Sequence, residues 1–322
     1  MSTAVRMFER ALYASQIRTY KHQMFSKCDQ CVCFTHLQSL ISDDNSAALE
    51  ELANLKNAHL AYVSRARERM RERANFAREH PEAVLMVNVD GMDQAKTNIP
   101  NESLKDKGGC VGMPLCVRLM GAIAYGRGWY GFWSVPQWGA TSNLTLTAID
   151  FIIGDVLKEG KRRGLKGSHL PPRLVIQMDN TAKDNKNHNL LGFAGMLLSE
   201  GYFQEIEAHF LPVGHTHQEI DQSFSLVSKA IKQQGALDLE DLMAVAGGAW
   251  RDLGYVGGHG KKHVLLDAVQ DYRRVFRHHA ASKQAADDGS EREDADDEPL
   301  NMYRFHGLGT DRRREQDQVS RR

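Results

Sequence analysis

The sequence lacks any long uninterrupted run of apolar residues. A helix that crosses a membrane needs roughly 18 to 20 such residues, and no stretch of this 322-residue chain approaches that length. The first ten residues, MSTAVRMFER, also lack the apolar core of an export signal. We therefore expect an intracellular protein without a membrane partner.

Cysteine is scarce, and the five cysteines present are an odd number. A disulfide framework needs paired cysteines and is typical of much smaller secreted domains. The cysteine content therefore favours a reducing compartment. Cys110 and Cys116 fall in a predicted strand, where reduced cysteines commonly serve as core residues.

The chain also lacks an excess of charge of either sign, with 41 basic and 41 acidic residues. Eight of the acids and only one of the bases lie in residues 287–298, which leaves 40 basic and 33 acidic residues elsewhere. The rest of the chain is therefore mildly basic, which permits phosphate binding without requiring it. Residues 64–73 interleave five arginines with two glutamates, a pattern that favours a solvated helix face with i,i+4 ion pairs over a phosphate-binding face.

Composition and periodicity divide the chain into four segments. Residues 1–40 are mixed and rich in Cys and His, and they look like the end of something longer. Residues 41–82 are predicted to form a helical extension and residues 83–254 the core domain. Residues 255–322 form a C-terminal extension, in which 281–298 are expected to be a disordered acidic linker.

Hydrophobic periodicity predicts the individual elements of these segments. The predicted helices cover 46–80, 143–164 with Asn143 as cap, 187–200, 218–233 and 239–250. The predicted strands cover 83–89, 110–125, 128–138, 173–178 and 203–211. Their order, three strands followed by alternating helices and strands, predicts an α/β fold with a mixed sheet flanked by helices.

Three short polar motifs stand where an apolar strand ends or a helix begins. They are Asp90-Gly91-Met92-Asp93-Gln94, Gln177-Met178-Asp179-Asn180 and Gly214-His215-Thr216-His217-Gln218-Glu219-Ile220-Asp221. Carboxylates at the strand ends of one sheet can converge on a single point, and Mg²⁺ and Mn²⁺ prefer oxygen ligands. We predict that Asp90, Asp179 and Asp221 bind Mg²⁺ or Mn²⁺ for phosphodiester chemistry. His215 or His217 would orient a ligand or assist proton transfer.

Each motif also has a plainer structural interpretation. Asp90 and Gly91 could form only a turn that ends the strand, and Asp221 could serve as a helix cap. A loop with a cap at Asn187 could explain the asparagines that follow Asp179. The third motif is the most specific of the three, because two histidines and two carboxylates within seven residues are seldom core packing.

Together the three motifs resemble an uncharacterised eukaryotic domain family of transposase-derived proteins with a ribonuclease H-like core. The resemblance covers about residues 85–235 and includes Asn185-Lys186-Asn187 and the string from Leu211 to Ser225. It implies a ribonuclease H-like mixed sheet with one carboxylate on the first strand, one at the end of the fourth and one on a helix after the fifth. It also implies DNA as the partner and a nuclear location, and leaves a homo-oligomer open.

Two other functions compete with a metal-dependent transposase or nuclease. A domesticated, non-catalytic module that binds nucleic acid or protein would keep the fold without the reaction, and the chain has no recognisable helix-turn-helix or complete zinc finger. Gly214-His215-Thr216-His217 is also similar to one motif of calcineurin-like metallophosphoesterases. The other motifs of that family, which bind its two metals, are missing from the sequence.

A second metal site is predicted near the start of the chain. Cys28 and Cys31 form a Cys-x-x-Cys pair, which is half of a zinc site. His36 could be the third ligand, with His22 or Cys33 as the fourth. Ordinary reduced cysteines are the plainer alternative, and half of a motif predicts only weak zinc binding unless an upstream segment completes it.

Overall fold

A computed structural model of the chain describes residues 28–42, 44–101, 114–138, 141–163, 170–179, 185–215, 219–250, 261–277 and 306–307. His22, Cys110, His217 and the predicted acidic linker lie outside these residues. The chain forms two compact units, one of residues 1–59 with 213–215 and one of residues 60–212 with 216–322. We call them the first unit and the second unit.

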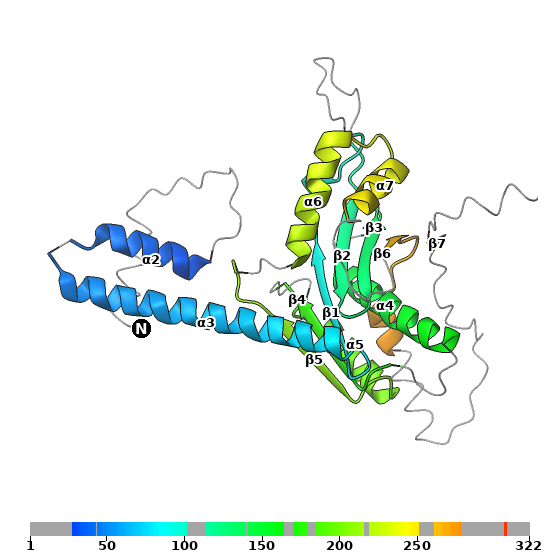
Figure 1. Cartoon of the computed structure of the whole chain (residues 1–322), viewed down its shortest axis with the longest axis horizontal. Coiled ribbons are helices and arrows are strands. Elements are labelled where there is room, and N and C mark those ends of the chain that lie inside the picture. Colours follow the sequence, from blue (N-terminus) through cyan, green and yellow to red (C-terminus); the bar gives the residue numbers. More distant parts are fainter. Residues whose placement is uncertain are drawn as a thin grey trace, which may run out of the picture. The chain divides into compact units, whose positions relative to one another are not determined.

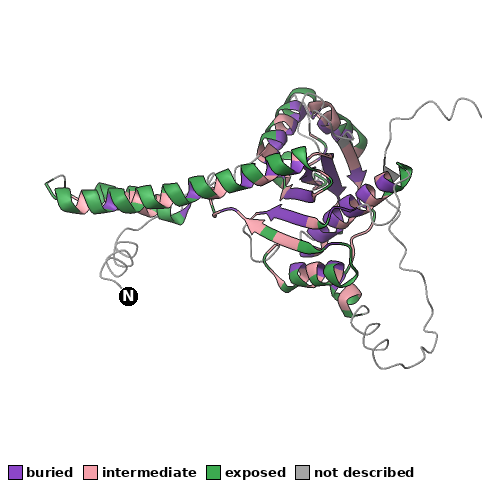
Figure 2. Ribbon diagram, turned by 60° about the horizontal axis from the view of Figure 1, so that its bottom comes forward, coloured by how far each residue is buried: buried purple, intermediate pink, exposed green. Residues whose placement is uncertain are grey.

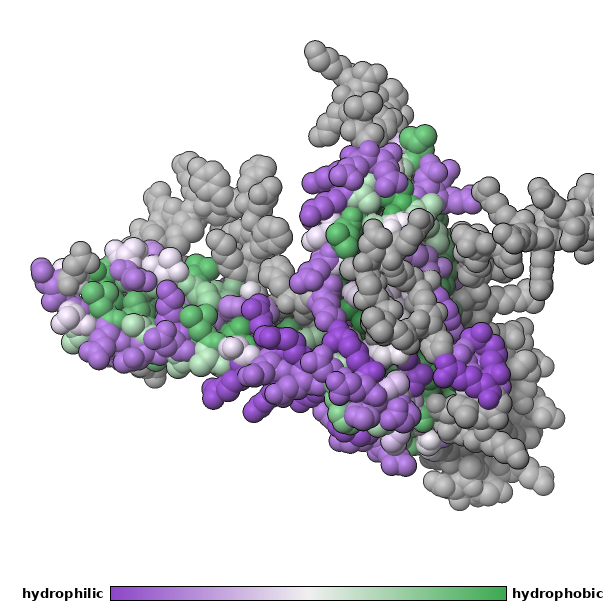
Figure 3. All heavy atoms as spheres, viewed as in Figure 1, coloured by the Kyte–Doolittle hydropathy of each residue, from purple (hydrophilic) through white to green (hydrophobic). Residues whose placement is uncertain are grey.

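The first unit contains helix α2 (Asp29–Leu40) and the start of helix α3 (Ser46–Glu79), which continues into the second unit. Helix α2 has no buried residue along its length. Val32 and Leu40 on α2 and Leu55 on α3 are exposed, and apolar side chains are visible on the surface of both helices (Figure 3). Little of the apolar surface of the described residues of this unit is therefore removed from water.

The second unit is built on one mixed sheet (Figure 1). Its strands are β1 (Val84–Gly91), β2 (Arg118–Ala124), β3 (Gly128–Ser134), β4 (Arg173–Met178), β5 (Glu205–Phe210), β6 (Lys261–Leu265) and β7 (His306–Gly307). They lie in the order β5-β4-β1-β2-β3-β6-β7. Strand β1 is antiparallel to β2 and parallel to β4, and β4 is parallel to β5. The predicted α/β fold with a mixed sheet is confirmed.

Helices cover both faces of this sheet. Alternate residues of β1 face opposite sides, because side chains in a strand alternate. Leu85, Val87 and Val89 join the core with α4 (Ser142–Arg162) and α5 (His188–Ser199). Val84 and Met86 join the core with the end of α3, α6 (Glu219–Gln234) and α7 (Leu239–Ala249). The central strands are accordingly buried, whereas much of α3 is exposed (Figure 2).

Most predicted elements agree with the structure to within a few residues. The predicted strand 173–178 is β4, and the predicted helix 46–80 is α3. The predicted cap of α4 is wrong, because the helix begins one residue earlier with Thr141 as its N-cap. Strand β6 lies in the C-terminal extension, for which no strand was predicted. None of the helices in the described parts of the chain is long and apolar enough to span a membrane.

Candidate metal centre and acidic site

Two of the three predicted aspartates lie at the C-terminal ends of neighbouring strands. Asp90 is near the end of β1, and Asp179 directly follows β4. The two strands are parallel neighbours, with Val89 opposite Met178. The next residue on each strand is therefore an aspartate, and neighbouring strands lie only about 4.8 Å apart. The fold thus brings Asp90 and Asp179 to adjacent strand ends.

Asp221, the third predicted aspartate, lies on helix α6, which packs against the sheet beside Asp90. Asp90 pairs with Gly121 of β2, and directly paired residues point to the same face of a sheet. A Cβ atom on Gly121 would lie 2.8 Å from Cε1 of Phe224 and 3.2 Å from Cδ1 of Ile220, both on α6. Because Gly121 has no side chain, the first turns of α6 approach the sheet beside Asp90. Asp221 lies in that first turn.

The pKa of Asp90 reflects the charges of the other two aspartates. The pKa of Asp90 is raised from its ordinary value of 3.8 to about 7. Burial is the largest cause, and the negative charges of Asp221 and, more weakly, Asp179 add to it. The backbone N–H of Gly91 donates a 2.8 Å hydrogen bond to Oδ1 of Asp90 and opposes the increase. A cation at this position would relieve the mutual repulsion of the carboxylates.

Other polar residues of the three motifs have local structural roles. Arg78 Nη2 donates to both carboxylate oxygens of Glu219 at 2.6 Å, so Glu219 is held in an ion pair. Asn185 Nδ2 donates to the backbone carbonyl of Asp179 at 2.9 Å, which ties the loop after β4 to the strand end. Asn187 accepts from two backbone N–H groups at the start of α5. The predicted cap at Asn187 is confirmed.

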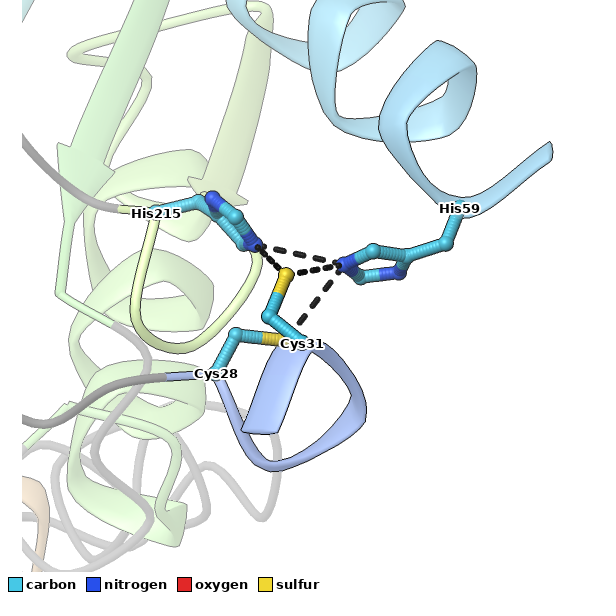
Figure 4. Close-up of side chains that lie close together, drawn as sticks. All are labelled: Cys28, Cys31, His59 and His215. Carbon is cyan, nitrogen blue, oxygen red and sulfur yellow. Dashed lines mark hydrogen bonds between the residues drawn. The ribbon is translucent and has the colours of Figure 1, made fainter. Parts of the chain in front are cut away.

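A cluster of thiol and imidazole side chains lies in the first unit. Cys28, Cys31, His59 and His215 point toward one another (Figure 4). Their ligand atoms all lie within 4.8 Å of one another. Cys28 is the N-cap of α2, and Cys31 lies in the first turn of that helix. His59 is on α3, and His215 belongs to the short segment after β5.

The distances in this cluster are short. Nε2 of His59 lies 3.4 Å from Sγ of Cys28 and 3.4 Å from Sγ of Cys31. Nε2 of His215 lies 3.4 Å from Sγ of Cys31 and 3.2 Å from Nε2 of His59. Burial, followed by the hydrogen bond and charge of Cys28, raises the pKa of the Cys31 thiol. Among the described residues this is the one group of three or more His, Cys, Asp or Glu side chains found close enough to hold a metal ion.

The structure corrects two of the predicted ligand roles. His36 was predicted as a zinc ligand with Cys28 and Cys31, but the group that converges contains His59 and His215 instead. Because α2 is helical from Asp29 onward, a residue five positions after Cys31 lies about 7.5 Å further along the axis and on a different face. Cys33 follows Cys31 by two positions, which places it about 200° around the helix and therefore on nearly the opposite side. His215 was predicted at the carboxylate site, and the structure places it in the Cys/His cluster.

The second unit is therefore a mixed α/β domain with acidic residues at the C-terminal ends of neighbouring strands. The first unit contains a Cys₂His₂ ligand set. The chain belongs to the family described as "Domain of unknown function (DUF7869)", whose model matches residues 109–286, more than half of the chain. Asp179, His215 and Asp221 lie within the matched residues, whereas Asp90 and the cysteine pair precede them. Comparison with curated proteins and with solved structures found no match.

Proposed function

We propose that the second unit is a transposase-derived, ribonuclease H-like domain that cleaves or transfers phosphodiester bonds of DNA. Asp90, Asp179 and Asp221 would hold Mg²⁺ or Mn²⁺. The observation that carries this proposal is that Asp90 and Asp179 lie at the ends of adjacent parallel strands. The first turn of α6, which contains Asp221, packs against the sheet beside Asp90. Three carboxylates from three separate elements are a suitable ligand set for hard cations.

The order of the strands supports the ribonuclease H-like part of the proposal. In that fold three antiparallel strands come first, and the fourth strand then pairs in parallel with the first. Here β4 lies beside β1 and β5 beside β4, in parallel, and β1, β2 and β3 form the antiparallel meander. Asp90 near the end of β1, Asp179 directly after β4 and Asp221 in the first turn of α6 support this part of the proposal.

Divalent cations held by Asp90, Asp179 and Asp221 would supply activation of the attacking oxygen and stabilisation of the leaving oxygen. Asp90 is the best candidate for a ligand shared by two cations, because it is mostly buried and the charges of the other two aspartates act on it. The raised pKa of Asp90 means that its charged form is costly without a cation. Metal binding would return this group to the carboxylate state.

In this proposal the exposed arginines of α3, whose sequence pattern alone favours a solvated face with i,i+4 ion pairs, would contact the DNA backbone. Arg65 and Arg69 are exposed on α3, and their spacing of four residues places both on one side of the helix. Arginine donors of this kind bind phosphate without regard to sequence. The proposal therefore includes sequence-independent affinity for DNA that falls with salt. A protein with this role would act in the nucleus.

A nicking assay on supercoiled DNA with Mn²⁺ or Mg²⁺ tests the proposal. We expect the full chain to nick the DNA, and Asp179→Ala and Asp90→Asn to reduce nicking by at least the roughly 100-fold typical of a lost catalytic electrostatic contact. Asp238→Asn is the matched control, because Asp238 is exposed and asparagine also serves as an N-cap, here of α7. Equal nicking by the parent and both site variants would overturn the proposal.

The second candidate is a domesticated module that binds nucleic acid without cutting it. It is favoured because the group of His, Cys, Asp or Glu side chains found close enough to hold a metal in the described residues is the Cys/His cluster and does not include the three aspartates. Such a module would bind DNA equally well in EDTA and in Mn²⁺ and would produce no nicked product. Salt-dependent binding together with metal-independent affinity would therefore select this function over the transposase.

A further inference from the structure

We propose that Cys28, Cys31, His59 and His215 bind one Zn²⁺ ion in a closed tetrahedral site that stabilises the first unit. These residues are different from those of the acidic site, so the proposal does not depend on the proposed reaction. It assigns the Cys-x-x-Cys pair a complete set of partners within this chain, without any upstream segment.

The distances fit the edges of a zinc tetrahedron. With Zn–S of about 2.3 Å and Zn–N of about 2.0 to 2.1 Å, two imidazole nitrogens on one ion are separated by about 3.3 Å and a nitrogen and a sulfur by about 3.6 Å. The two Nε2 atoms are 3.2 Å apart, and three nitrogen–sulfur distances are 3.4 Å. Four of the six edges of the tetrahedron therefore match a zinc site closely, and the other two pairs of ligand atoms lie within 4.8 Å of each other.

The donor atoms select the metal and its role. Two thiolates and two imidazoles suit Zn²⁺ and are poor ligands for Mg²⁺ or Mn²⁺. Catalytic zinc sites have three protein ligands and keep one position for water or substrate, whereas structural sites have four. Four protein ligands leave no open position here. A structural role follows from the ligand number.

The first unit needs such a support, because its described residues bury very little apolar surface. Leu52 and Cys28 are the buried apolar residues among them. Helix α2 has 12 residues and buries none of them, and an isolated helix of that length is marginal in water. Small units without a sufficient core are commonly held together by a metal or by disulfides. The ion would join α2, α3 and the segment of His215.

The position of His215 in the sequence means that a bound ion would also restrain the connection between β5 and α6. His215 lies in the connection between β5 and α6, and only residues 216–218 separate it from the first residue of α6. A zinc ligand at this point would restrain the chain just before the helix that bears Asp221.

Metal analysis of the purified full chain provides the first test. We expect one zinc per chain, and with Co²⁺ in its place the intense visible absorption of a tetrahedral site with thiolate ligands. His59→Ala and Cys31→Ser should weaken zinc binding by more than the roughly 10- to 100-fold that is lost when a residue that only orients a metal ligand is removed. His36→Ala and Cys33→Ser are the matched controls on α2 and should bind as the parent does. Loss of zinc in the controls but not in His59→Ala would overturn the assignment.

Thiol alkylation of the unmodified chain gives a second test that needs no variant. Mass spectrometry would locate the alkylated cysteines with and without EDTA. We expect Cys28 and Cys31 to be protected until EDTA removes the metal, whereas Cys33 and Cys116 react at the same rate in both conditions. Equal protection in both conditions, or a Cys28–Cys31 disulfide without bound metal, would contradict a zinc site.

Discussion

Replacement of Asp90 with asparagine should stabilise the metal-free protein at high pH and not at low pH. Asparagine keeps the shape of the side chain and an oxygen that can accept the hydrogen bond from Gly91. It removes the charge that burial and the other aspartates make costly. The variant therefore separates the electrostatic cost of Asp90 from its packing.

The size and direction of this effect follow from the pKa. Because the folded-state pKa of Asp90 is about 7 and the ordinary value is 3.8, the folded protein holds a proton that the unfolded chain has lost between these values. The free energy of unfolding of the parent therefore falls as pH rises from about 4 to about 7. At about 1.4 kcal/mol per pH unit, the variant should be more stable by on the order of 4 kcal/mol at pH 8 and by close to nothing at pH 4.

Urea unfolding followed by tryptophan fluorescence measures this difference. All four tryptophans lie in the second unit, as does Asp90, so the signal reports on the unit that contains the acidic site. Both proteins would be unfolded in EDTA between pH 4 and pH 8, with Asp238→Asn as a control for the loss of one charge. Parallel stability curves for the parent and Asp90→Asn would show that folding does not raise the pKa of Asp90, and the electrostatic argument for the acidic site would fail.

Three further predictions concern the same unit. Asp221→Asn should abolish the rise in melting temperature that Mn²⁺ gives the parent, whereas an unchanged rise would identify Asp221 as a helix cap only. Gly121→Ala should cost roughly 1 to 3 kcal/mol in urea unfolding, because the new Cβ would lie 2.8 Å from Phe224. Gly154→Ala on α4 should instead raise stability by up to about 1 kcal/mol, since nothing lies within 4 Å of its Cβ position; equal effects of the two changes would refute the close approach of α6. Asn187→Ala should cost about 1 kcal/mol through loss of the α5 cap, and no loss would show that the cap contributes nothing.

The elements that could be predicted are those whose local sequence is sufficient to specify them. Strand β4 is a short run of apolar residues after two prolines, and α5 has a good cap in Asn187 followed by regularly spaced apolar residues. Strand β6 has the sequence KKHVL, which carries little apolar signal of its own. It is held by parallel pairing with β3 and by His263, whose Nδ1 accepts a 3.0 Å hydrogen bond from Nε1 of Trp133. Contacts between distant residues of this kind leave no periodic pattern in the sequence.

The neighbouring positions of Asp90 and Asp179 were easier to predict from the sequence than the Cys/His cluster, because they depend on strand ends that the sequence itself indicates. Asp90 and Asp179 each end an apolar strand, and parallel strands bring such ends together whatever the connections between them. The Cys-x-x-Cys pair indicates two zinc ligands, and a complete site requires two more. The sequence does not identify those two residues. The nearest histidines in sequence, His22 and His36, were the natural candidates by spacing.

The ligands that the structure brings to the cysteines are far away in the chain. His59 is 28 residues after Cys31, and His215 is 184 residues after it. His215 was assigned to the acidic site because it lies close to Asp221 in sequence, but the two residues belong to different units. Proximity in sequence is a poor guide where a short connection joins two units. The chemical type of the donor is the better guide, because imidazole matches thiolate in a zinc site and carboxylate matches carboxylate in a magnesium site. By that criterion His215 belongs with Cys31, and Asp221 belongs with Asp90. Metal analysis after incubation with zinc or with manganese should therefore show two sites of different metal preference in one protein.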